Sequence, residues 1–171
     1  MNARTDPSRK RLTKNFSLHE FTRSQTATRL GIDNSLPEHM MLDIQRLASW
    51  LQALRDAISA HYEVEAPISI SSGYRCTKLN NKVGGSKNSF HSKALAVDIE
   101  CSILTTEELF QFIRSCMRFG QVIQEFDGWV HVSLNMDANQ SENQALRATK
   151  VPRKFRKPKT VYTEVVNYAP S

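Results

Sequence analysis

The chain has 171 residues, of which 40% are hydrophobic and 23% are charged, and these are ordinary values for one soluble globular domain with a single core. No apolar run approaches the roughly 20 residues that a membrane-spanning helix needs, and no apolar stretch follows the basic N-terminus as it would in a secretory signal. We therefore expect a protein without a membrane span, made in a cytosol without a signal peptide.

The net charge of +6 is concentrated at the two ends of the chain. Residues 1–14 contain five Lys or Arg and one acid, residues 147–171 contain seven and one, and residues 15–146 contain 11 basic and 15 acidic residues. The basic runs are interrupted by prolines and contain few interleaved aromatic residues, which argues against a nucleic-acid partner. We expect the basic ends to meet anionic envelope polymers instead.

The first 14 residues are expected to form a flexible basic arm. Ser17 and Glu20 then have the spacing of a capping box, which predicts a short helix. After a loop that ends at Pro37, apolar residues recur at helical spacing and predict a long helix. These apolar residues are Leu47, Leu51, Leu54 and Ile58.

Strand patterns begin after Pro67. ISISS and ALAVDIE predict two strands, and TTEELFQFIRSCMRFG predicts a capped helix that ends at Gly120. VIQEF and WVHVSL, separated by Asp127 and Gly128, predict a hairpin. The order of elements predicts an α+β fold with a small, mostly antiparallel sheet packed with helices.

The pattern weakens from Asn135 onward. Residues 135–160 are polar and then basic, so we expect a poorly packed segment there, and TVYTEVVNY favours one last strand. The predicted organisation is therefore a folded domain over 15–134 and a basic tail, partly packed at most, over 135–171.

Three cysteines, Cys76, Cys101 and Cys116, are too few and too scattered for a disulfide framework or a cysteine zinc site. Cys116 lies within a helical pattern, and we expect it in the core.

Three side chains that can bind a metal lie in or beside the predicted strands: His91, Asp98 and His131. A carboxylate in an apolar strand needs a cation or several hydrogen bonds. Two imidazoles and one carboxylate leave the fourth position of a tetrahedral site open, as in catalytic zinc sites, and the same set suits non-haem iron. On the residues alone, a hydrogen-bonded core histidine and an aspartate that caps a loop are the alternative.

The stretch SGYRCTKLNNKVGGSKNSFHSKALAVDI, residues 72–99, resembles the signature of the M15 zinc peptidases, which include D-Ala-D-Ala carboxypeptidases and phage endolysins. WVHVS at 129–133 is similar to the second block of that family, and FSLHEFTRSQTATRLGIDN at 16–34 is similar to the entry segment of many phage members. The resemblance covers roughly residues 16–134. It implies a Hedgehog/DD-peptidase-like fold and a Zn²⁺ cofactor held by His91, Asp98 and His131.

The resemblance also implies that Arg75 and Ser89 bind substrate. Arg75 matches an arginine whose planar donors suit a peptide carboxylate or a developing oxyanion. Gly84 and Gly85 let the backbone turn tightly before the ligand loop. The family usually has glycine where Ala94 stands, so the loop before the second strand is a point of departure.

The general base is the second departure, because many relatives carry it at the position of Gly128. The available acids are Glu125 and Asp127, and the similarity of EFDGWVHV to some relatives favours Glu125. A two-residue turn at Asp127-Gly128 would pair Glu125 with Val130, on the face away from His131. A three-residue loop over 127–129 would pair Glu125 directly with His131.

These features predict a zinc metallopeptidase of carboxypeptidase or endopeptidase type that acts on the peptidoglycan stem peptide. A phage lysis enzyme (endolysin) that is a monomer and works on the cell wall in the periplasm fits the expected lack of a signal. The alternative is a zinc-containing module of the same fold that binds cell wall without cutting it, which the glycine at 128 favours.

Overall fold

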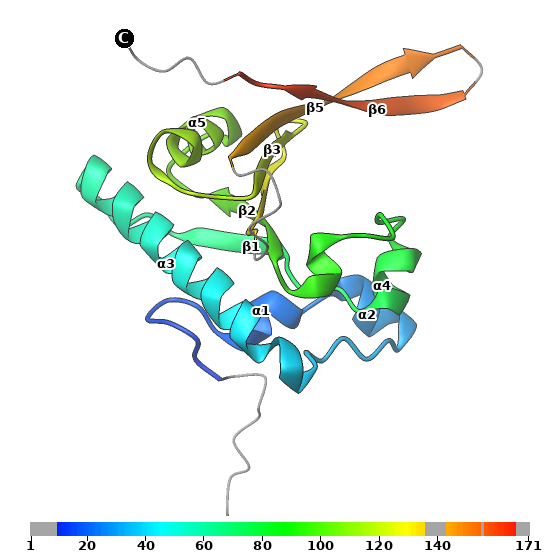
Figure 1. Cartoon of the computed structure of the whole chain (residues 1–171), viewed down its shortest axis with the longest axis horizontal. Coiled ribbons are helices and arrows are strands. Elements are labelled where there is room, and N and C mark those ends of the chain that lie inside the picture. Colours follow the sequence, from blue (N-terminus) through cyan, green and yellow to red (C-terminus); the bar gives the residue numbers. More distant parts are fainter. Residues whose placement is uncertain (1–9, 136–142, 155, 167–171) are drawn as a thin grey trace, which may run out of the picture. The chain divides into compact units, whose positions relative to one another are not determined.

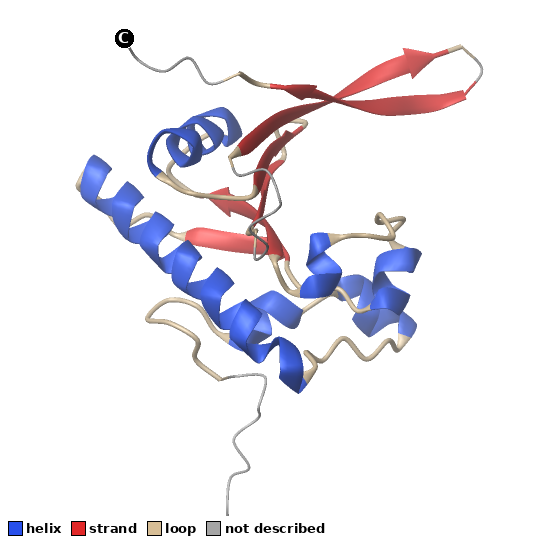
Figure 2. Ribbon diagram, viewed as in Figure 1, coloured by secondary structure: helices blue, strands red, loops and turns tan. Residues whose placement is uncertain are grey.

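The computed structural model describes residues 10–135, 143–154 and 156–166. Its helices are α1 (Leu18–Thr22), α2 (Gln25–Leu30), η2 (Glu38–Met40), α3 (Met41–Tyr62), α4 (Thr77–Lys82), η3 (Phe90–Lys93) and α5 (Thr106–Cys116). Its strands are β1 (Ile68–Ser72), β2 (Ala96–Cys101), β3 (Gln121–Glu125), β4 (Trp129–Ser133), β5 (Gln144–Arg153) and β6 (Arg156–Glu164). They form a sheet of order β1-β2-β4-β3-β5-β6, so the predicted α+β class is confirmed (Figures 1 and 2).

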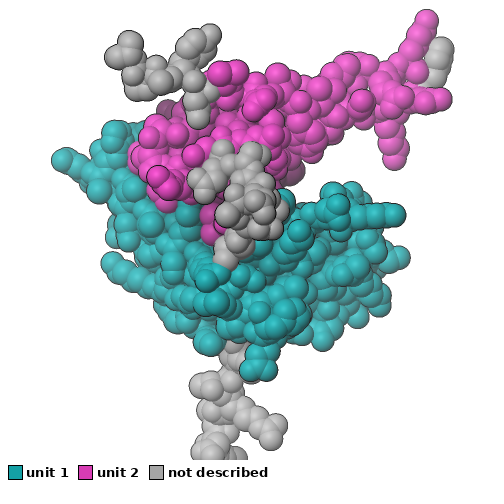
Figure 3. Space-filling view, in the orientation of Figure 1, with its two compact units in different colours: residues 1–66, 70–98 teal, residues 67–69, 99–171 magenta. Residues whose placement is uncertain are grey.

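The chain divides into two compact units, residues 1–66 with 70–98 and residues 67–69 with 99–171 (Figure 3). Strands β1 and β2 contribute residues to both units. None of the described helices is long and apolar enough to cross a membrane.

In the first unit, the long helix α3 supplies much of the core. Its start at Met41 follows the short 3₁₀ helix η2, which begins after Pro37. The predicted apolar positions are all fully buried, together with two neighbours on the same face, and the predicted helix is confirmed. The buried side chains are Ile44, Leu47, Ala48, Leu51, Leu54 and Ile58.

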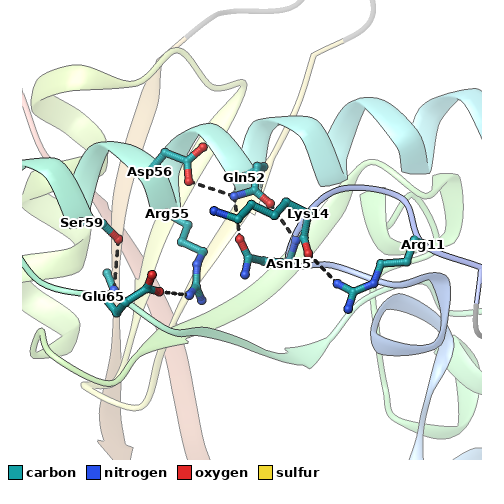
Figure 4. Close-up of polar contacts among 9 residues, drawn as sticks. Arg11, Lys14, Asn15, Gln52, Arg55, Asp56, Ser59 and Glu65 are labelled. Carbon is teal, nitrogen blue, oxygen red and sulfur yellow. Dashed lines mark hydrogen bonds and ion pairs between the residues drawn. The ribbon is translucent and has the colours of Figure 1, made fainter.

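The segment before α1 is fixed on α3 by the amide of Gln52. Its oxygen accepts a 3.0 Å hydrogen bond from the Thr13 hydroxyl. The same oxygen accepts a 3.0 Å hydrogen bond from the Asn15 N–H, and the Gln52 side-chain nitrogen donates to the Asn15 side chain at 2.9 Å (Figure 4). Leu12 and Phe16 are buried. Residues 10–14 therefore contact the folded domain, which differs from the flexible arm expected there, and residues 1–9 lie outside the described residues.

Helix α1 begins with the predicted capping box. The Glu20 carboxylate accepts 2.7 Å hydrogen bonds from both the N–H and the hydroxyl of Ser17. The sequence analysis did not predict α2, which begins at a Ser24 cap and ends at Gly31 with φ of +60°.

In the second unit, α5 begins at Thr105, which forms a capping box with Glu108. The helix ends at Cys116, earlier than the predicted end at Gly120, because Met117 already has extended backbone. Cys116 is exposed, so the expectation that it lies in the core was wrong. The buried apolar side chains of α5 are Leu109, Phe110 and Ile113.

The predicted hairpin is formed by the antiparallel strands β3 and β4. β3 also pairs in parallel with β5 along its whole length, and β5 pairs antiparallel with β6. The last strand expected in TVYTEVVNY is present through Glu164. A poorly packed segment was expected over residues 135–160, whereas the structure has strand β5 within that range. β5 buries Ala145 and Ala148 beside β3.

Candidate metal centre

His91 is oriented by the segment that follows β1. It lies in η3, is only 2% exposed, and its Nδ1 atom is 2.7 Å from the carbonyl oxygen of Gly73. Since a carbonyl oxygen can only accept, Nδ1 carries a hydrogen, and Nε2 is then the nitrogen through which the neutral ring can bind a metal. A metal-ligating histidine is commonly fixed by such a bond from its other nitrogen.

Asp98 lies opposite that nitrogen. Its Oδ1 atom is 3.3 Å from His91 Nε2, and its side chain is 12% exposed. Two acceptor atoms at this distance in a buried setting repel each other unless a cation or a proton lies with them. Two ligands about 2.0–2.1 Å from a tetrahedral Zn²⁺ are about 3.3 Å apart, so the spacing of this pair fits a shared zinc ion.

His131, in β4, completes the group. His91, Asp98 and His131 each offer one ligand atom, and the three atoms lie within 4.8 Å of one another. Two imidazoles and one carboxylate are a donor set that zinc uses in catalytic sites, where the remaining position is left for water or substrate. The residues present therefore fit the implied metal.

Gly73 is a residue of this site that the sequence analysis did not single out. A Cβ atom at this position would lie 2.4 Å from the carbonyl oxygen of Phe21, which itself accepts a 2.7 Å hydrogen bond from the Tyr74 N–H. Only glycine allows the backbone to pass this close to Phe21 and still present its carbonyl to His91. The glycine in the motif SGYR is the feature of the sequence from which this role of Gly73 could have been predicted.

Arg75 belongs to the same segment, and its N–H donates to the His91 carbonyl at 3.2 Å. Its side-chain Nε is buried and has no hydrogen-bond partner among the described residues. Burial lowers the pKa of the guanidinium, whereas the Asp98 carboxylate acts in the opposite direction. Arg75 lines a pocket of about 250 Å³ together with Gly73 and Tyr74, so it can offer donors to a bound anion.

The ligand loop itself contains two backbone positions with positive φ. Gly84 has φ of +75°, as expected for a tight turn before the loop. Ala94, where the family usually has glycine, is fully buried and has φ of +58°, so this alanine occupies a conformation that glycine adopts more easily. Ser89 directly precedes η3, is half-buried, and its hydroxyl makes no capping hydrogen bond.

The hairpin loop contains Phe126, Asp127 and Gly128, and Glu125 pairs with Trp129. Neither loop considered from the sequence is therefore present. Directly paired residues share a face, and so do residues two apart in a strand, so Glu125 and Trp129 lie on the face of His131. The loop shape thus puts Glu125 diagonally next to His131.

The carboxylate of Asp127 points elsewhere. It accepts a 2.9 Å hydrogen bond from the amide of Gln124, a residue on the opposite face of β3 from Glu125. The Asp127 carbonyl accepts a 3.0 Å hydrogen bond from the Thr106 hydroxyl. Asp127 therefore ties the turn to its surroundings, and of the two acids Glu125 is the one on the face of His131.

Comparison with known protein families gives one finding. The family model described as Peptidase M15 matches residues 14–133, well over half of the 171-residue chain. None of the curated protein sequences compared with the chain matches it.

Proposed function

This chain belongs to the M15 peptidase family, and from that premise we propose that it is a zinc-dependent peptidase that hydrolyses a bond in the stem peptide or cross-link of peptidoglycan. The observation that carries the proposal is the clustering of His91, Asp98 and His131 within 4.8 Å. These three residues would hold a Zn²⁺ ion, which would supply polarisation of the scissile carbonyl and lower the pKa of a water molecule.

Glu125 acts as the general base in this proposal. It lies on the same face of the β3–β4 hairpin as His131, two pairs of residues away along the ladder. A carboxylate there takes the proton of the attacking water and passes it to the amine that leaves. Positioned proton transfer of this kind contributes on the order of 10²–10⁴-fold to turnover.

Arg75 holds the substrate. Arg75 lines a pocket, and the planar donors of its guanidinium suit a carboxylate or carbonyl oxygen of a peptide. Ser89, at the start of η3, is the second substrate-contacting residue that we propose.

The biological setting that we propose is phage lysis, with the enzyme acting on the cell wall as an endolysin. Exposed cations on the strands β5 and β6 and between them support a further proposal, that this ribbon of residues 144–164 binds anionic envelope polymers. These exposed residues are Lys150, Arg153, Lys154, Arg156, Lys157 and Lys159.

A non-cutting cell-wall-binding module is the second candidate, and Gly128 at the position where many relatives carry the base is the observation that favours it. Mass spectrometry of muropeptides before and after digestion separates the two candidates. Zinc-loaded protein should release new peptide ends from purified walls, and the bond cut follows from their masses. Wall binding without any new product would contradict the peptidase proposal.

A further inference from the structure

The strands that follow the family-matched region extend the face that carries Glu125. The match ends at residue 133, whereas β5 and β6 begin at 144 and 156. β5 pairs with β3, the strand of Glu125, and β6 pairs with β5. A substrate that lies across this face therefore meets side chains that the family model does not include.

One row of directly paired residues crosses four strands at the level of the base. Trp129 in β4 pairs with Glu125 in β3, Glu125 pairs with Ala148 in β5, and Ala148 pairs with Tyr162 in β6. Paired residues share a face, so all four side chains project to the side of His131. Adjacent strands are about 4.8 Å apart, so the backbones of Glu125 and Tyr162 are separated by about 10 Å.

Ala148, the residue between Glu125 and Tyr162 in this row, is small. Ala148 carries only a methyl group, so nothing in the row rises between the carboxylate and the phenol ring. Burial raises the pKa of the Tyr162 hydroxyl, and the charge of Glu125 raises it further, which agrees with a ring that lies near the carboxylate.

Tyr162 is accessible. It is 52% exposed, and Trp129 at the other end of the row is 37% exposed. Glu125 is therefore flanked on both sides by aromatic side chains that a peptide can reach. Tyrosine offers such a peptide an apolar ring and a hydroxyl that donates or accepts a hydrogen bond.

We propose that Tyr162 is a substrate-contacting residue, which binds the peptide on the β5–β6 side of Glu125 through its ring and a hydrogen bond from its hydroxyl to a carbonyl or carboxylate oxygen. The inference rests on the proposed peptidase function and deepens it. It assigns a specificity-determining role to a strand outside the matched region, and it limits the substrate on this side to groups that accept a hydrogen bond.

The experiment measures peptide binding separately from cleavage. A soluble stem peptide is titrated by calorimetry into the zinc-loaded full chain carrying Glu125→Gln, alone and combined with Tyr162→Phe, Tyr162→Ala or the control Thr163→Ala. Thr163 follows Tyr162 in β6 and lies on the opposite face. Losing one neutral hydrogen bond should weaken binding about 3- to 10-fold in Tyr162→Phe. Tyr162→Ala should lose more, and Thr163→Ala should bind like its parent.

Kinetics of the same variants with an intact Glu125 give a second readout. Tyr162→Phe should raise KM by a similar factor and leave kcat nearly unchanged, because the contact is made in substrate and transition state alike. Ala148→Phe places a large ring between Tyr162 and Glu125 while both residues keep their identity, and it should also raise KM. Zinc content and thermal unfolding of each variant show that the fold is retained.

The outcomes separate the inference from the function on which it rests. If the parent binds and cleaves the peptide while Tyr162→Phe, Tyr162→Ala and Ala148→Phe match it, the role of Tyr162 is wrong and the peptidase stands. If the parent binds the peptide without cleaving it, the peptidase proposal fails. The calorimetric titration of the Tyr162 variants still tests whether Tyr162 contacts the peptide. A zinc-loaded parent that neither binds nor cleaves the peptide contradicts both.

Discussion

Glu125 lies directly opposite Trp129 across the β3–β4 ladder, and His131 is two residues further along the same face. This places a carboxylate beside His131, a candidate metal ligand, even though the loop position at 128 is a glycine. The family-typical base position is therefore not the only place from which an acid can reach this face.

The first prediction concerns this base. Glu125→Gln should keep zinc and fold and lower turnover of purified wall by roughly 10²-fold or more, since it removes the proton acceptor. Asp127→Asn should cost much less, because the Asp127 carboxylate is bonded to Gln124 and its amide replacement still offers an oxygen. If Asp127→Asn were inactive while Glu125→Gln stayed active, the general base would be Asp127 and not Glu125.

The second prediction concerns the metal. Purified protein should bind close to one zinc per chain, and His91→Ala, Asp98→Ala and His131→Ala should each lower zinc content measured by atomic absorption. Zinc removal by a chelator should lower the thermal unfolding temperature, since metal bound only to the folded state stabilises it. Retention of parental zinc by all three variants would show that the ion binds elsewhere.

The third prediction concerns Gly73. Gly73→Ala should weaken zinc binding, because the new Cβ meets the Phe21 carbonyl at 2.4 Å and must displace the carbonyl that orients His91. Gly128→Ala is the matched control, since its Cβ would meet only the Glu125 carbonyl at an ordinary 3.4 Å. Zinc affinity from competition with a chelating dye compares the two, and equal affinities would contradict the close-approach argument.

The fourth prediction concerns Ala94, at φ of +58°. Ala94→Gly relieves the strain of an alanine in the left-handed conformation, which stabilises the fold by roughly 1–2 kcal/mol. Two effects oppose this gain. Loss of the buried methyl group costs about 0.8 kcal/mol, and the greater freedom of glycine in the unfolded chain costs about 0.4–1 kcal/mol. The free energy of unfolding in urea should therefore change little. Ala94→Val should destabilise strongly, because a β-branched residue fits this conformation poorly. A large loss in Ala94→Gly would mean that the methyl contacts dominate.

The fifth prediction concerns the basic ribbon. Because residues 144–148 of β5 pair with the whole of β3, charge substitutions farther along the ribbon disturb the base less than a truncation at 147 does. Lys154, Lys157 and Lys159 changed together to Gln should weaken binding to whole envelopes, most at low salt, and leave cleavage of a soluble peptide unchanged. The matched control changes three exposed lysines of the first unit, Lys78, Lys82 and Lys87, and equal loss in both sets would contradict a specific role of the ribbon.

Local patterns in the sequence were enough for the elements that bury a periodic face. The apolar spacing of α3 and the capping boxes at Ser17 and Thr105 depend on neighbours within a few residues, so they could be predicted. The metal-ligand candidates could be named because a buried aspartate in an apolar strand has few physical explanations.

Contacts between distant segments explain what could not be predicted. Asp127-Gly128 is a strong local turn signal, yet the central residues of the turn are Phe126 and Asp127, with φ of +53° and +60°. Thr106 holds the Asp127 carbonyl, and the Lys150 ammonium lies 4.9 Å from the centre of the Phe126 ring. These tertiary contacts outweigh the turn propensity, and they also decide that Glu125 shares a face with His131.

Strand β6 ends the sheet, and its composition has a consequence for self-association. An edge strand presents unpaired backbone groups that can template pairing with another copy of the chain. Here that edge includes Pro158, which has no N–H to donate, between the exposed cations Lys157 and Lys159. Two such edges would repel each other and lack part of a hydrogen-bond ladder, so a long exposed ribbon can be displayed at high protein concentration without edge-to-edge aggregation.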